Sequence, residues 1–200
     1  LNYISKYGFQ LATDPVFIEE VSVFEFRERY LSDLSELSNG KQFITDKMPQ
    51  NFRFIPLICA ALPEAKIIHV TRNATATCWS NFRQYFRSNG LGYCYDLKDV
   101  VDYYKLYKDL MTIWQSRYGT RIYNLNYEKL VNEQEKESRK LIGHLDLTWE
   151  EALLLPHKNK RTVKTASQQQ VRQKVYTGSS EAWRKYERFL NSAFDSLPSS

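Results

Sequence analysis

Long apolar runs are missing from this chain of 200 residues. No stretch of eighteen apolar residues occurs, and no short apolar segment follows basic residues near the first position. A transmembrane helix needs about twenty such residues, and a signal peptide needs the basic and apolar parts together. The sequence therefore predicts a soluble protein with no membrane partner.

Cysteine is also scarce, and the cysteine spacing excludes the common metal sites. Cys59, Cys78 and Cys94 each lie in an apolar or aromatic setting, with no CxxC pair and no two histidines at metal-ligand spacing. We expect three reduced core residues and no bound metal.

Glycine-rich phosphate loops are the third absence. The seven glycines are scattered, and neither GxxxxGK nor GxGxxG occurs. In such loops glycine lets backbone N–H groups approach a phosphate closely. Residues 1–200 contain neither pattern.

The charge nevertheless indicates an anionic partner. The formal net charge is +5 and the pI is about 9.0. Because the 23 acidic residues are spread along the whole chain, a phosphorylated small molecule suits this balance better than nucleic acid. With 42% apolar residues the chain can form one α/β domain, which we place at residues 1–190, with a polar tail at 191–200.

The pattern along the chain alternates between helices and strands, which is typical of a parallel sheet covered by helices. The expected strands are 42–45, 66–70 and 121–127, lying side by side and parallel with helices on both faces. The expected helices include 16–38, a segment opened by Pro49, a segment capped by Asn73, 99–117, 138–145 and a short one capped by Thr148. The predicted fold class is α/β.

The stretch KIIHVTRNATATCWSNFR, residues 66–83, contains a candidate anion site. Arg72 follows an expected strand at the sheet edge where α/β proteins bind ligands, and the next helix directs free N–H groups there. Ser80 lies about two helical turns into that helix, with Thr77 one turn nearer. A guanidinium and a hydroxyl can then hold one phosphate. The alternative from spacing alone is that Arg72 pairs with a surface carboxylate and Ser80 faces solvent.

A second motif, TDKMPQNF at residues 45–52, follows the preceding expected strand. Lys47 is a compact cation in a turn that Pro49 stiffens, so it could neutralise charge on a bridging oxygen during phosphoryl or sulfuryl transfer. Its alternative is an ordinary loop lysine. Asp46 is better suited to a local hydrogen bond than to the role of catalytic base.

Taken together, five ordered blocks resemble the sulfotransferases, in particular the bacterial tetratricopeptide-associated and tyrosylprotein-type branch. The blocks lie between Leu31 and Leu190: FITDKMPQNF, LPEAKIIHVTRNATATCWSNFRQYF, DYYKLYKDLMTIW, NLNYEKLV and VKTASQQQVRQKVYTGSSEAWRKYERFL. The resemblance implies a P-loop-NTPase-like three-layer α/β/α fold. It also implies the donor 3′-phosphoadenosine 5′-phosphosulfate (PAPS), the product 3′-phosphoadenosine 5′-phosphate (PAP), and transfer to a hydroxyl or amine.

The resemblance also assigns residues. Arg72 and Ser80 match the positions that grip the 3′-phosphate, and Lys47 matches the lysine that reaches the phosphosulfate bridge. Ser167 matches a serine that assists the leaving phosphate. Tyr127 matches a tyrosine near the nucleotide, although core packing is an equal alternative. The covering C-terminal stretch contains three cations from which one or two would reach the 3′-phosphate: Arg172, Lys174 and Arg184.

Two departures from the family pattern are visible. Asn73-Ala74 replaces a charged residue and proline after the strand arginine, which leaves helix capping intact. The Arg-Ser-Gly-Thr type loop that binds the 5′-phosphosulfate is absent, as is the strand before it. The carboxylate base that follows this loop would lie before residue 1. We therefore expect the C-terminal part of a sulfotransferase domain, catalytically incomplete as these 200 residues alone.

The acceptor and the wider context stay open at this point. An incomplete sheet edge would favour pairing with a second copy of the chain. A bacterial-type cytoplasm fits better than a Golgi lumen. Two other functions remain alternatives: a relative of P-loop kinases, which share the sheet topology, and a nonenzymatic interaction module that uses the aromatic surface.

Overall fold

The computed structural model describes residues 20–86, 90–159 and 172–198. Contacts group these residues into two compact units. The first unit contains the described residues up to Ile67 together with Asp109–Arg121, and the second contains Ile68–Lys108 and the residues from Ile122 onward. Each unit has its own apolar core.

The first unit is helical. It contains α2 (Glu20–Ser38), the 3-10 helix η2 (Pro49–Phe54), α3 (Ile55–Ala61), the end of α5 (Leu97–Tyr118) and the 3-10 helix η4 (Gly119–Arg121). Helix α2 packs against α3, and its Arg27 binds Glu64 at 2.8 Å just beyond α3. The core of this unit consists of Phe26, Tyr30, Phe54, Ala61 and Leu62. Pro49 begins η2, as expected for a residue whose missing N–H costs nothing in a first turn.

The expected strand at residues 42–45 is wrong. Residues 43–48 form no regular element, and Phe43 and Ile44 are 64% and 42% exposed. A strand depends on hydrogen bonds to a neighbouring strand, and in the described part of the chain the sheet contains only β1 and β2. Without a neighbouring strand, the backbone N–H and C=O groups of an apolar segment have no ladder of hydrogen bonds to stabilise the strand conformation.

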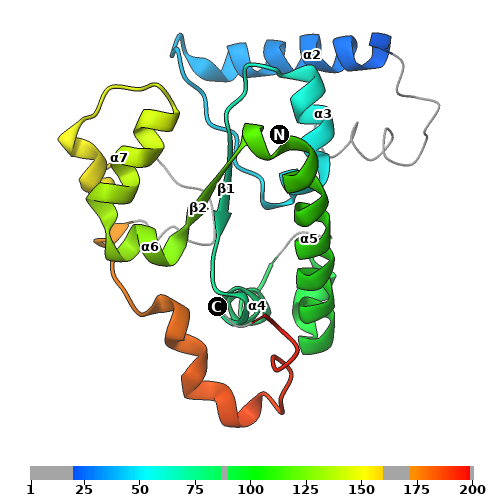
Figure 1. Cartoon of the computed structure of the whole chain (residues 1–200), viewed down its shortest axis with the longest axis vertical. Helices are drawn as coiled ribbons and strands as arrows, with labels where there is room; N and C mark the ends of the chain where they lie inside the picture. Colours follow the sequence, from blue (N-terminus) through cyan, green and yellow to red (C-terminus); the bar gives the residue numbers. More distant parts are fainter. Residues whose placement is uncertain (1–19, 87–89, 160–171, 199–200) are drawn as a thin grey trace. The chain divides into compact units, whose positions relative to one another are not determined.

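The sheet consists of β1 (Ile67–Thr71), which belongs to the second unit from Ile68 onward, and β2 (Ile122–Asn126). The two strands are parallel neighbours (Figure 1). On one face, the His69 ring hydrogen-bonds to Asn124 Oδ1 at 2.9 Å and to Tyr107 Oη of α5 at 2.6 Å. On the other face, the Tyr123 ring lies 4.6 Å from the ring of His144 in α7 (Gln134–His144). Since successive strand residues point to opposite faces, helices cover both sides of this α/β sheet.

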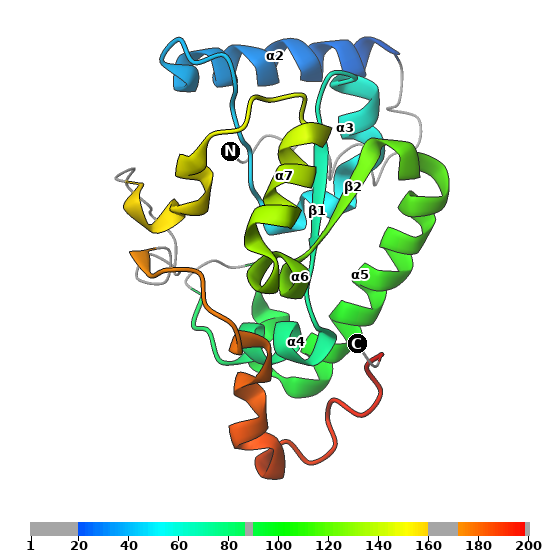
Figure 2. The same ribbon diagram turned by 60° about the vertical axis from the view of Figure 1, so that its left-hand side comes forward.

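Each strand runs directly into a helix. Helix α4 (Ala74–Phe82) follows β1, and α6 (Tyr127–Asn132) follows β2 and packs against α7 (Figure 2). The other elements of this unit are 3-10 helices: η3 (Gly92–Tyr95), η5 (Glu151–Leu154), η6 (Pro156–Lys158) and η8 (Ser179–Phe189). Asn73 caps α4 as expected, whereas Glu150 rather than Thr148 occupies the cap position of η5.

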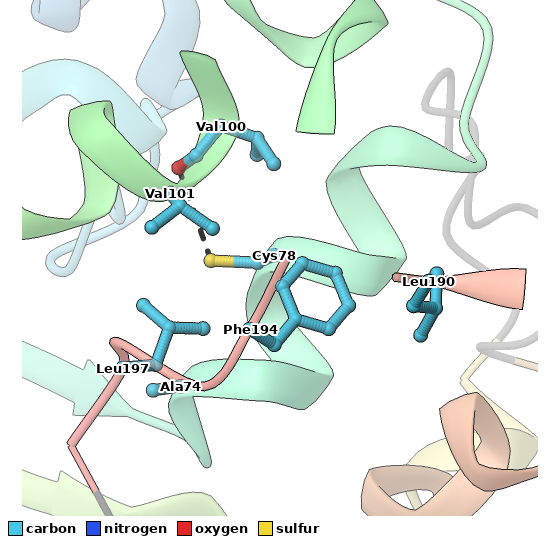
Figure 3. Packing of buried hydrophobic residues seen from close by; sticks show 7 residues of the cluster. All are labelled: Ala74, Cys78, Val100, Val101, Leu190, Phe194 and Leu197. Carbon is cyan, nitrogen blue, oxygen red and sulfur yellow. Dashed lines mark hydrogen bonds between the residues drawn. The ribbon is translucent and has the colours of Figure 1, made fainter. Parts of the chain in front are cut away.

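The core of the second unit joins α4 and the start of α5 to the C-terminal stretch (Figure 3). The Cys78 thiol is buried and donates to the carbonyl of Val100 at 3.8 Å. The stretch after Asn191, expected to be a polar tail, contributes Phe194 and Leu197 to this core. All three cysteines are free, and two of them are buried, in agreement with their expected role. The C-terminal residues are therefore part of the packing that supports α4.

Replacing Phe194 by alanine should lower the free energy of unfolding by about 3 kcal/mol, because it leaves a cavity beside Cys78 and Leu197. Urea denaturation followed by tryptophan fluorescence measures the loss. Phe189→Ala is the matched control, since Phe189 is 62% exposed and should change stability by less than about 1 kcal/mol. Equal losses for the two variants would contradict the assignment of Phe194 to the core.

Candidate anion site at the end of β1

The turn after β1 is built around Asn73. Its side-chain oxygen accepts the N–H of Ala76 at 2.8 Å, and its carbonyl accepts both the N–H and the hydroxyl of Thr77, each at 2.9 Å. This is a regular N-cap, which ends β1 and begins α4 within two residues. The cap holds the residue before it, Arg72, at the N-terminal end of α4, where the helix dipole is positive.

The guanidinium of Arg72 contacts two other elements of the second unit. Its Nη2 donates to the carbonyl of Ser179 at 2.8 Å, and its Nε donates to Oγ of Ser180 at 3.2 Å. The guanidinium carbon also lies 5.1 Å from the ring centre of Tyr127. A cation over an aromatic face is attracted by the ring quadrupole. Arg72 is therefore held by the start of η8 and the start of α6.

Two further hydrogen bonds connect these elements to each other. Tyr127 Oη and Ser179 Oγ are 2.9 Å apart, and the hydroxyl of Ser180 donates to Oε1 of Glu128 at 2.6 Å. The same carboxylate oxygen accepts the backbone N–H of Asn73 at 3.0 Å. Glu128 thus bonds to the turn that carries Arg72 and to the serine that binds the guanidinium.

The environment of Glu128 favours its ionised form. Burial opposes ionisation, but hydrogen bonds from Ser180 and from backbone N–H groups, together with the charge of Arg72, outweigh it and lower the pKa of Glu128. A carboxylate and a guanidinium therefore share one half-buried cluster. Anions that reach Arg72 would find a cation already oriented by protein groups.

The structure brings together only some of the predicted site residues. Arg72 and Tyr127 are in contact, whereas Ser80 is exposed on α4 and Thr77 serves the cap. Arg172 and Lys174 are exposed. Arg184 is exposed on η8, pairs with Glu181 and stacks over Trp183. Ser167 lies outside the described residues.

Lys47 belongs to the first unit, where its turn is anchored on both sides. The Tyr30 hydroxyl of α2 donates to Oδ2 of Asp46 at 2.9 Å, so Asp46 is a local hydrogen-bond partner as expected. Burial and this bond raise the pKa of Tyr30, which keeps its proton on the hydroxyl. Pro49 begins η2 two residues after Lys47. The lysine side chain itself is exposed.

Three members of the cluster were missed from the sequence: Glu128, Ser179 and Ser180. One signal was available for Glu128, because it directly follows Tyr127 at the end of a predicted strand. For the serines one local signal is Gly178, the glycine directly before η8. Its φ of 86° lies in the left-handed region, which glycine adopts more readily than other residues. Their separation from Arg72 by more than a hundred residues hid the contact.

Among residues 20–86, 90–159 and 172–198, no group of three or more His, Cys, Asp or Glu side chains is placed to bind a metal ion. No helix in these ranges is both long and apolar enough to cross a bilayer.

Glu128→Gln should lower the free energy of unfolding by about 1 kcal/mol near neutral pH, because hydrogen bonds to an ionised acceptor are stronger than those to a neutral one. The pKa of Glu128 is below its ordinary value of 4.5 in the folded chain, so its carboxylate stabilises the fold above pH 4.5. That contribution is lost as the pH falls through the lowered pKa. The difference between wild type and variant should therefore shrink in acid.

Urea denaturation at several pH values between 3 and 7 measures this difference. Glu187→Gln removes an exposed carboxylate from η8 and serves as the control, for which little change is expected at any pH. A loss for Glu128→Gln that stays constant down to pH 3 would contradict the role of its ionised form.

Two comparisons with known proteins relate the chain to others, and the first of them gives its family. A family model described as "Sulfotransferase family" matches residues 12–151. A protein of Aquifex aeolicus (strain VF5), described only as uncharacterized, is 34% identical over 186 residues, which cover 88% of this chain and 24% of that protein. The chain thus spans about a quarter of the length of the curated relative it matches. Since the family model covers well over half of its residues, this chain belongs to the sulfotransferase family.

Proposed function

We propose that this chain binds the nucleotide of PAPS and takes part in sulfuryl transfer to a hydroxyl or amine, with Arg72 as the main ligand of the 3′-phosphate. The observation that carries this proposal is the oriented guanidinium at the carboxyl end of β1, directly before the capped start of α4. In open α/β sheets this is the edge at which ligands bind. Family membership supplies the reaction type, sulfuryl transfer.

The geometry of Arg72 suits a phosphate. A guanidinium has five donors arranged on two edges. Its two hydrogen bonds to Ser179 and Ser180 use the edge formed by Nε and Nη2. The other edge, formed by Nη1 and the second Nη2 proton, carries neither of these bonds and can hold a phosphate with two parallel hydrogen bonds. The positive end of the α4 dipole would support the same charge.

Other residues would complete the nucleotide site. We assign Ser80 to the 3′-phosphate as a hydroxyl donor and Tyr127 to the neighbourhood of the nucleotide through its ring. Arg172 and Arg184 are assigned as cations of the C-terminal stretch, and Ser167 as a group that assists the leaving phosphate. These assignments are supported by the match of their positions to the family pattern and, for Tyr127, by its contact with Arg72.

The chemical role that we propose for Lys47 concerns the transition state. When bound, the donor would supply a sulfuryl group on its 5′-phosphate. An acceptor oxygen or nitrogen would form a bond to sulfur and give up its proton to a general base or to solvent, while the bond from sulfur to the bridging oxygen breaks and the phosphate leaves with the electron pair. The Lys47 ammonium would stabilise the negative charge that develops on this oxygen. Its anchored turn, with Asp46 held by Tyr30, would limit reorganisation during the step.

If Arg72 binds the 3′-phosphate, the wild-type chain should bind adenosine 3′,5′-bisphosphate more tightly than adenosine 5′-monophosphate. Arg72→Ala should then weaken binding of the bisphosphate about tenfold or more and leave the monophosphate nearly unchanged, because a charge-assisted hydrogen bond contributes roughly 1.5–3 kcal/mol. Isothermal titration calorimetry with both nucleotides measures the effect.

Arg188→Ala controls for the loss of one positive charge. Arg188 is an exposed cation of η8, and its removal should weaken binding of both nucleotides equally and only slightly. Equal affinity of the wild-type chain for the two nucleotides would contradict the proposed 3′-phosphate site.

Lys47→Ala should lower kcat by roughly a hundredfold or more while changing the donor KM little, because its interaction strengthens only as charge develops in the transition state. Steady-state kinetics on a form of the protein that shows sulfuryl transfer measures kcat and the donor KM separately.

Arg72→Ala provides the contrast in the same assay, since it should act mainly through donor binding. Lys66→Ala controls for the loss of a lysine, because Lys66 is exposed just before β1. An unchanged kcat for Lys47→Ala would mean that the DKMP turn is structural.

A further inference from the structure

We propose that Ser180 and Glu128 are positioning residues for the nucleotide site, which orient Arg72 so that one edge of its guanidinium faces a 3′-phosphate. This inference rests on the proposed function, since it presupposes that Arg72 binds the phosphate. Neither residue is assigned contact with the nucleotide; both act through Arg72.

A continuous chain of hydrogen bonds carries the inference. Nε of Arg72 donates to Ser180 Oγ at 3.2 Å, and the Ser180 hydroxyl donates to Glu128 Oε1 at 2.6 Å. The Asn73 N–H donates to the same oxygen at 3.0 Å. One carboxylate oxygen therefore fixes the backbone next to Arg72 and, through Ser180, the side chain of Arg72. This arrangement restrains both ends of a long and flexible side chain.

The direction of each bond gives Ser180 a role that an apolar residue cannot fill. Its oxygen accepts a hydrogen bond from the guanidinium, and its O–H donates a hydrogen bond to Glu128. The hydroxyl therefore acts as acceptor and as donor at the same time. Alanine at this position would break the chain in the middle without changing any charge. The Ser179 carbonyl and the Tyr127 ring would still contact Arg72, so the guanidinium would stay in place but lose one of its restraints.

Glu128 also sets the charge of the cluster before a ligand arrives. Its carboxylate partly balances the guanidinium, since the charge of Arg72 helps to lower the pKa of Glu128. Because Glu128 binds Ser180 and Asn73 rather than Arg72 directly, it leaves the second guanidinium edge for an anion. An oriented arginine loses less side-chain entropy on binding than a free one.

The test compares nucleotides that differ only in the 3′-phosphate. Ser180→Ala should weaken binding of adenosine 3′,5′-bisphosphate about five- to tenfold and change the affinity for adenosine 5′-monophosphate less than twofold, as measured by isothermal titration calorimetry. Ser180→Thr keeps a hydroxyl and should restore most of the difference. Ser180→Cys, which resembles serine in size but is a weak hydrogen-bonding group, should weaken bisphosphate binding even if the alanine variant does not fold.

A double-mutant cycle tests whether the two residues act as one chain. Ser180→Ala and Glu128→Ala should each weaken bisphosphate binding, and the double variant should lose little more than the larger single loss. Ser196→Ala, which removes an exposed hydroxyl from the same unit, should leave both affinities unchanged. Additive losses, or equal effects on the two nucleotides, would overturn the inference.

The outcomes also separate this inference from the function on which it rests. If the wild-type chain does not distinguish the two nucleotides, the 3′-phosphate site fails and this inference fails with it. Suppose instead that the wild type binds the bisphosphate more tightly and that Arg72→Ala abolishes this difference in affinity. If the Ser180 variants then retain the difference, only the positioning role is overturned.

Discussion

The hydrogen bond from Arg72 Nη2 to the carbonyl of Ser179 ties the end of β1 to residues more than a hundred positions later in the chain. This long-range link joins the turn between β1 and α4 to the start of η8. It brings the start of η8 to the residue before the cap of α4, and η8 packs against α4. Figure 2 shows η8 next to α4. The ring centres of Trp79 and Tyr186 lie 4.8 Å apart with the rings tilted by 33°. Leu190, Phe194 and Leu197 pack with Ala74 and Cys78 in the apolar core. The helix next to the proposed phosphate site is therefore supported by the C-terminal residues.

Arg72 and Lys47 have different proposed roles, and their side chains differ in burial and in hydrogen bonding. Arg72 is half-buried, bonded through two donors and placed over an aromatic ring, which suits a ligand that must be held in one orientation. Lys47 is exposed on a turn whose backbone is anchored through Asp46 and Pro49. A flexible ammonium on a fixed turn suits a charge that appears only briefly.

The sequence predicted most local features and the parallel pair of β1 and β2, but it also predicted a third strand that the described residues do not form. β1, the Asn73 cap and the long helix α5 agree with expectation, because apolar periodicity and capping chemistry act over a few residues. The strand at 42–45 failed although its residues have strand propensity, since pairing depends on a neighbour that local sequence cannot supply. Similarly, the polar composition after Asn191 hid Phe194 and Leu197, whose burial depends on α4 and α5.

For the candidate site, the sequence by itself determined that a cation stands between a strand and a capped helix, and that a lysine stands in a proline-stiffened turn. These features depend on the order of neighbouring residues, and they belong to two of the five sequence blocks that carry the family resemblance, which the family model bears out. Only the tertiary structure decided which groups hold Arg72. The order of residues near Arg72 pointed to Ser80 only as a second phosphate ligand, whereas the guanidinium itself is bound by Ser179 and Ser180 and linked through Ser180 to Glu128. The physical reason is that a hydrogen bond depends on distance and direction in space, which the chain sets only when α4, α6 and η8 pack together.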